Sequence, residues 1–278
     1  MKKLTTLMVA LFVVAGISFA QSNETTITQS SNNNSANVDQ AGMDNIATIV
    51  QTGGNQNSAT IRQSSDPAED GVIESIIRQN GFNNTAVTNG SRKNSASSIT
   101  EQVQNGNNNR AYINPAEGSS PGGNEGTTLT QVQIGNQNYA TMDGSDSYRA
   151  EQYQNGFSNV AKTSGNGKNG DVYQRQVGNN NFAEANGLSF ANSEQLQFGN
   201  ENISDLDGIG HDGPGESYYT RQNGNSNTAL LFANGNGGVL DIVQTNNQNY
   251  ARVNWTTVGN STTISQNGYG NDAIVNSN

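Results

Sequence analysis

Amide side chains recur in this sequence at spacings that suit hydrogen-bonded stacking. A column of glutamines returns every 21 to 29 residues, and consists of Gln29, Gln51, Gln79, Gln104, Gln133, Gln154, Gln176, Gln197, Gln222, Gln244 and Gln266. An asparagine follows most of them by five residues, and the second column is Asn34, Asn57, Asn84, Asn109, Asn138, Asn159, Asn181, Asn202, Asn227, Asn249 and Asn271. Because an amide both donates and accepts, identical amides one repeat apart can bond along a row.

Groups for conventional catalysis or metal binding are sparse. The chain has no Cys and a single histidine, His211, which lies in a Gly- and Asp-rich stretch without the partners of a Ser-His-Asp site. Asp205, Asp207 and Asp212 offer oxygen ligands for calcium but lack the spacing of calcium-binding β-rolls. Acidic residues form no recurring pair of the kind that cleaves glycosides. We therefore expect no catalytic residue, no cofactor and no metal site.

The elements that hold the two columns are short strands joined by a tight turn. Most copies carry a glycine between the Gln and the Asn, and an alanine two residues after the Asn, so the unit reads Gln-x-Gly-x-x-Asn-x-Ala. Residues on each side of the turn alternate with period two, as in Leu129, Gln131 and Gln133, which is the signature of a strand. A period of 20 to 50 residues indicates a repeat architecture. The sequence predicts an all-β chain, a β-solenoid of about eleven strand-turn-strand repeats with two facing parallel sheets in a cross-β arrangement.

Stacking explains how so polar a chain could fold. Asn occurs 46 times and Gln 22 times, whereas hydrophobic residues make up only 31% of the chain. A buried amide without a partner costs about 1–3 kcal/mol, but one in a column can donate to the next copy and accept from the previous one. Composition alone would also fit a disordered segment. The agreement in phase between the amide columns and the strand alternation favours the solenoid.

Other features vary more along the chain. The return corners are short at 41–44 but are expected to form long loops at 114–126 and 207–216, which accounts for the irregular spacing. Most charged residues fall at outward positions, for example Arg78 and Glu194. The tyrosines are expected near corners and on outward positions, where cross-strand packing is their simplest role.

The N-terminus has the pattern of an export signal. Lys2 and Lys3 precede a mostly apolar run that ends at Ile17, and small residues lead to Ala20. We expect cleavage between Ala20 and Gln21, and divide the chain into a signal peptide (1–20), a short N-terminal segment (21–26) and the repeat region (27–278). No later segment is apolar enough to form a spanning helix. The formal net charge of −10 argues against nucleic acid as a partner.

The repeat unit resembles that of the curlin family. Gln40, Gly42, Asn45, Ala47 and Gln51 spell out the curlin pattern, and the resemblance covers nearly the whole mature chain. It implies export through the periplasm and a dedicated outer-membrane secretion channel, with accessory factors, to the outer surface of a bacterium. It also implies assembly with itself, or with a related curlin subunit, into curli-type amyloid fibres that serve adhesion and the biofilm matrix.

The sequence departs from that family pattern in two ways. The second glutamine, present at Gln40, Gln51 and Gln63, is replaced in later copies, for example by Gly144 and Gly165. The chain also has about twice the usual number of repeats, which leaves open whether it is the main subunit, a nucleator or a larger relative. No polar capping repeat is visible at either end, and bare solenoid ends favour head-to-tail growth into a filament. The alternative is a monomeric secreted β-solenoid that acts as an adhesin or ligand-binding module through its long loops.

Overall fold

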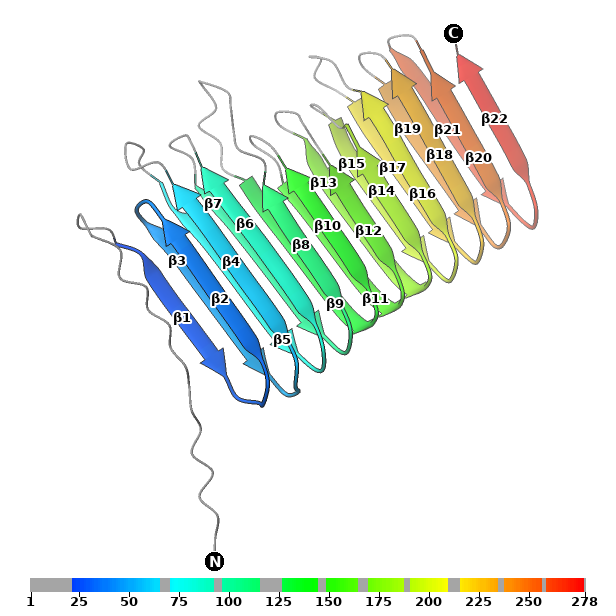
Figure 1. Ribbon diagram of the computed structural model, residues 1–278. Helices are drawn as coiled ribbons and strands as arrows, with labels where there is room; N and C mark the ends of the chain where they lie inside the picture. The colour runs from blue at the N-terminus through cyan, green and yellow to red at the C-terminus, as the bar shows by residue number, and fades with distance from the viewer. Residues whose placement is uncertain are drawn as a thin grey trace, which may run out of the picture.

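The chain winds into a straight stack of two-stranded layers (Figure 1). The computed structural model describes residues 22–65, 71–92, 97–115, 127–144, 149–164, 170–187, 191–209, 216–234, 238–256 and 259–277. These residues form 22 strands in two sheets of eleven, and every pairing between neighbouring strands is parallel. The predicted all-β solenoid with two parallel sheets is thereby confirmed.

Odd-numbered strands make the first sheet, which we call sheet A. In stacking order they are β1 (Glu24–Gln29), β3 (Asn45–Thr52), β5 (Ile73–Asn80), β7 (Ser98–Asn105), β9 (Thr127–Asn136), β11 (Arg149–Phe157), β13 (Asp171–Asn179), β15 (Ala191–Phe198), β17 (Glu216–Asn223), β19 (Gly238–Thr245) and β21 (Asn260–Asn267). Each strand ends near a glutamine of the predicted column.

Even-numbered strands make sheet B. In stacking order they are β2 (Ser35–Ala41), β4 (Ser58–Ser65), β6 (Thr85–Arg92), β8 (Arg110–Pro115), β10 (Tyr139–Gly144), β12 (Val160–Ser164), β14 (Phe182–Asn186), β16 (Ile203–Ile209), β18 (Thr228–Asn234), β20 (Tyr250–Trp255) and β22 (Asp272–Ser277). One odd and one even strand form a layer, which we call a rung. With ~4.8 Å between strands, eleven rungs span on the order of 50 Å.

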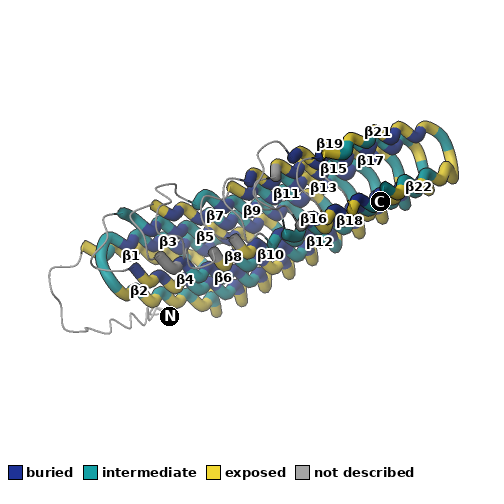
Figure 2. The backbone as a smooth tube through the Cα atoms, turned by 90° about the horizontal axis from the view of Figure 1, so that it is seen from above, coloured by how far each residue is buried: buried dark blue, intermediate teal, exposed yellow. Residues whose placement is uncertain are grey.

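The core is a thin line of side chains between the two sheets. Figure 2 shows buried residues alternating with more exposed ones along the strands between the two ends of the stack, as expected when every second side chain points inward. In β3 the inward residues are Asn45, Ala47, Ile49 and Gln51, all fully buried. Amides and aliphatic groups therefore share one interior, and the amides need partners within it.

Two of the expected return loops are shorter than predicted. Asn114 already belongs to β8, and Asp207 belongs to β16, because both strands extend along their neighbours in the stack. Glu216 opens β17 and is only 1% exposed, so it is an interior residue rather than part of a loop. The expected signal peptide and its cleavage point at Ala20 and Gln21 lie outside the described residues, as do His211 and Asp212.

Candidate functional site

The glutamine column forms one unbroken row of hydrogen bonds. Each side chain from Gln29 to Gln244 donates through Nε2 to Oε1 of the glutamine on the next rung, at 2.6–2.9 Å. All eleven predicted glutamines are joined in this way, and we call the row the outer glutamine ladder. Its hydrogen bonds all run in the same direction, from the N-terminal rung towards the C-terminal rung.

The same glutamines also tie the two sheets together. From Gln51 to Gln266, each Nε2 group makes a second hydrogen bond to a main-chain carbonyl of sheet B, at 2.8–3.0 Å. Gln154, for example, donates both to Gln176 and to the carbonyl of Tyr139. Both N–H groups and the oxygen of such a side chain are therefore used, which offsets the cost of burying it.

The asparagine column forms a second ladder with the opposite direction. Each Nδ2 group from Asn57 to Asn271 donates to Oδ1 of the asparagine on the preceding rung, at 2.8–3.3 Å. The same Oδ1 also accepts the main-chain N–H of the next asparagine, as Asn84 does from Asn109. All eleven predicted asparagines are joined. The two ladders give every rung a defined upper and lower side.

The turn between the columns requires glycine at one position. Gly106 has φ 126°, and a Cβ placed on it would lie 1.9 Å from the carbonyl oxygen of Gly135 on the next rung. Several other turns repeat this arrangement, among them Gly156 and Gly178. The residue just before the ladder asparagine also has positive φ, as at Asn108 and Asn180. The turn thus lets adjacent rungs approach closely enough for the ladders to form.

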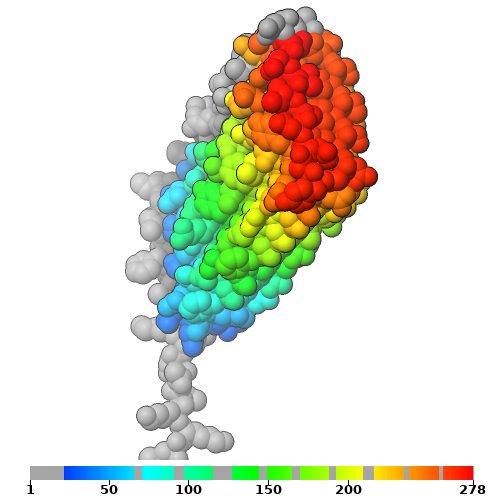
Figure 3. Space-filling model, turned by 90° about the vertical axis from the view of Figure 1, so that its right-hand side faces the viewer, coloured from blue at the N-terminus to red at the C-terminus, as the bar shows by residue number. Residues whose placement is uncertain are grey.

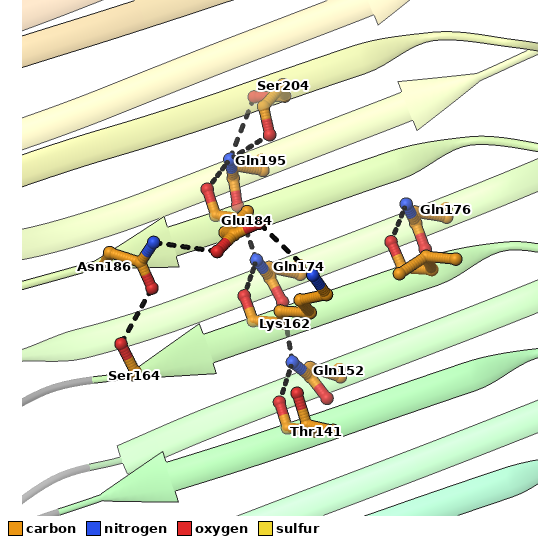
Figure 4. Close-up of polar contacts among 11 residues, drawn as sticks. Thr141, Gln152, Lys162, Ser164, Gln174, Gln176, Glu184, Asn186, Gln195 and Ser204 are labelled. Atoms are coloured by element: carbon orange, nitrogen blue, oxygen red, sulfur yellow. Dashed lines mark hydrogen bonds and ion pairs between the residues drawn. The ribbon is translucent and has the colours of Figure 1, made fainter.

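The amide pattern of the sequence did not lead us to predict a further glutamine ladder, of which Figure 4 shows the part from Gln152 to Ser204. Gln102, Gln131, Gln152, Gln174 and Gln195 are joined Nε2 to Oε1 at 2.6–3.0 Å. The ladder ends at Ser204, whose hydroxyl accepts from Gln195. These residues stand two positions before the outer ladder, where Ile49 and Ile77 stand in earlier rungs. The repeated Gln-x-Gln pattern in these strands is the sequence feature that could have predicted this ladder.

A short ladder occupies the opposite edge of the first two rungs. Gln40 donates to Oε1 of Gln63 at 2.9 Å, and Asn45 donates to Oδ1 of Asn23 at 3.2 Å. The Nε2 group of Gln63 donates to the hydroxyl of Ser75 and not to another glutamine, so the ladder ends there. The loss of the second glutamine in later copies therefore ends this edge ladder at the third rung.

Most charged groups lie on the outward faces, as expected for Arg78, which pairs with Glu101, and for Glu194. On sheet B, Lys162 pairs with Glu184 at 3.6 Å, and Glu184 lies directly beside Asp205 in the parallel register. Partial burial, with the carboxylates of Glu184 and Asp207, raises the pKa of Asp205. Within the described ranges, no group of three or more His, Cys, Asp or Glu side chains is arranged to hold a metal ion.

Tyr218 departs from the expectation that tyrosines face outward. It is 2% exposed, and its hydroxyl donates to the carboxylate of buried Glu216 at 3.0 Å. Burial and the neighbouring carboxylate raise the pKa of Tyr218. Its ring lies 6.4 Å from that of Trp255, so both rings fill the core near the edge of the stack where the chain returns from sheet B to sheet A, which we call the return edge.

The first two rungs carry the match to a known family. Residues 20–53 match the curlin associated repeat. The chain therefore contains a curlin associated repeat. The matched segment holds the first two members of the outer glutamine ladder, and the same geometry continues through all eleven rungs of the stack. No curated protein matches the chain.

The chemistry open to this arrangement is the extension of its own ladders. The curlin repeat indicates a curli-type structural subunit. In the part of the chain that the structure describes, no helix is both long and apolar enough to cross a membrane.

Proposed function

We propose that this protein is a structural subunit of an extracellular curli-like amyloid fibre, built by stacking the last rung of one copy on the first rung of the next. The curlin associated repeat at residues 20–53 supports export to the cell surface and a role of the fibre in adhesion and biofilm matrix. A secretion channel and accessory factors complete the expected set of partners.

The observation that carries the proposal is the match between the two ends. The inward residues of the first rung reappear in the same columns of the last rung, as the pairs Thr25 and Thr262, Ile27 and Ile264, Gln29 and Gln266, Asn34 and Asn271, Ala36 and Ala273, and Val38 and Val275. Stacking one end on the other would therefore continue each ladder with the residue it already contains.

The end strands are open to receive a neighbour. β1 and β2 pair on one side only, as do β21 and β22. Figure 3 looks at the C-terminal end, where the last strands (red) lie uncovered. Within the described residues, Gln266 donates only to the carbonyl of Tyr250, and Oε1 of Gln29 accepts no hydrogen bond. Gln266 of one copy can thus donate to Gln29 of the next and preserve the direction of the outer ladder.

Unpaired strand edges are templates for another chain. A contact between two different ends does not close on itself, so repetition generates a filament. With both ends of each copy buried, the fibre would present a continuous cross-β lattice. A fibre grown this way is polar, because every joint places the last rung of one copy on the first rung of the next.

The test measures seeded elongation of residues 21–278 by thioflavin fluorescence, with fibre diffraction of the product. Ile27 is 37% exposed at the open end, so Ile27→Lys is tolerated by the free subunit but would bury an unpaired charge in the joint. Thr26→Lys, on the outward face of the same strand, is the matched control.

We expect wild type and Thr26→Lys to elongate into fibres with reflections near ~4.7 and ~10 Å, and Ile27→Lys to stop elongation. Equal elongation by both variants would overturn the proposed joint. A wild-type chain that stays monomeric by light scattering would overturn the fibre function and favour a monomeric adhesin.

A further inference from the structure

A hollow on the outer face of sheet A has the chemistry of a ligand site. It has a volume of about 460 Å³ and lies over β11, β13, β15 and β17, which are neighbours in the middle of the stack (Figure 1). Both outward side chains and residues of the return edge line it. We call it the β11–β17 hollow.

Acidic and aromatic side chains alternate along the hollow. Glu151, Tyr173, Glu194 and Tyr219 occupy one outward column on four successive rungs, each directly beside the next in the parallel register. The spacing between like groups is therefore two rungs, or ~9.6 Å. A tyrosine ring beside a carboxylate attracts an organic cation through both its face and the neighbouring charge. The repetition suits an extended ligand with more than one cationic unit.

The charge balance of the hollow favours a cation. Arg149 donates to Glu151 at 2.6 Å, so these two charges offset each other. Asp171, which lies beside Arg149 in the parallel register, and Glu194 also line the hollow, so one arginine faces three carboxylates. Two carboxylates remain to attract a positive ligand, whereas an anionic ligand would be repelled.

Uncharged polar groups line the hollow as well. Asn192 and Ser217 are exposed and add an amide and a hydroxyl beside the carboxylates. Such groups suit a ligand that carries hydroxyls as well as amines.

We propose that the β11–β17 hollow binds a polysaccharide of amino sugars with free amines. Asp171 and Glu194 pair with the ammonium groups, the rings of Tyr173 and Tyr219 lie against the flat faces of the sugars, and Ser217 hydrogen-bonds a hydroxyl. A few convergent polar groups beside aromatic rings are the usual make-up of a specific pocket. This site does not depend on the end-to-end joint, and it exists in the free subunit.

The test titrates freshly refolded, monomeric 21–278 with a glucosamine oligomer by calorimetry, and compares the fully N-acetylated oligomer, a glucose oligomer and a lysine peptide of matched length. We expect the glucosamine oligomer to bind at least tenfold more tightly than each of the others. Equal affinity for the acetylated or glucose oligomer would overturn the charge argument, and equal affinity for the peptide would overturn the assignment to a sugar.

Two variants locate the site. Glu194→Gln and Tyr219→Leu change outward side chains and should each weaken glucosamine binding at least fivefold. Glu74→Gln on β5 removes a carboxylate from the same sheet outside the hollow and should bind like wild type. If Glu74→Gln weakens binding as much as Glu194→Gln, the interaction is a general charge effect and the proposed site is wrong.

Discussion

Replacing one glutamine in the middle of the outer ladder tests whether the ladder stabilises the stack. Gln154 accepts from Gln133, donates to Gln176 and donates to the carbonyl of Tyr139, all at 2.9–3.0 Å. Gln154→Leu keeps most of the side-chain volume but removes all three hydrogen bonds. It leaves a donor on Gln133 and two acceptors without their partner in a buried site.

The expected loss follows from those three groups. Each unsatisfied buried group costs about 1–3 kcal/mol, and the added apolar burial of Leu offsets about 2 kcal/mol, so a net loss of about 4 kcal/mol is expected. In a repeat stack this loss is local to the rung and its neighbours. Since 1.4 kcal/mol is a factor of ten, amide protection in β11–β14 should fall on the order of a thousandfold.

Hydrogen exchange read by mass spectrometry on dilute, freshly refolded chain measures this protection rung by rung. Asn155→Ala, at the adjacent exposed position, is the control and should change protection little. A fall of less than tenfold for Gln154→Leu, or an equal fall for the control, would refute the reasoning that paired interior amides stabilise the stack.

Three further predictions address the turn, an acidic residue and an outward face. Gly106→Ala should lower stability by about 3 kcal/mol, because it combines positive φ with a Cβ overlapping the next rung; thermal unfolding of the unassembled chain checks it, and an unchanged midpoint would contradict it. The folded state raises the pKa of Asp205 above 3.8, so its charged form costs stability at pH values above the raised pKa and costs nothing below 3.8. Asp205→Asn should therefore raise the unfolding midpoint at pH 7 and leave it unchanged at pH 3, and equal shifts at both pH values would argue against burial and the neighbouring carboxylates as the cause. The guanidinium of Arg175 lies 5.5 Å from the ring of Tyr153 and 5.6 Å from that of Phe198, so Arg175→Ala should cost about 1 kcal/mol in denaturant titration, whereas Arg175→Lys should retain part of it.

The sequence determined the class of fold because its signal is periodic. Each Gln-x-Gly-x-x-Asn-x-Ala unit must do the same thing in every copy, and only stacking gives identical amides identical partners. The repeat alone predicts the strand phase, the turn and the two amide columns. It also makes the first and last rungs alike, since Ile27 and Ile264 occupy the same position of the repeat.

Tertiary structure alone decided how the variable positions are used. The further glutamine ladder, from Gln102 to Gln195, depends on which residues face each other across five rungs, and irregular loop lengths hide that register in the sequence. The opposite directions of the two ladders depend on amide orientation, which composition does not encode. The β11–β17 hollow likewise brings Glu151 and Tyr219, 68 residues apart, onto one column. Local spacing specifies a rung, whereas contacts between distant rungs follow from how the rungs are aligned in space.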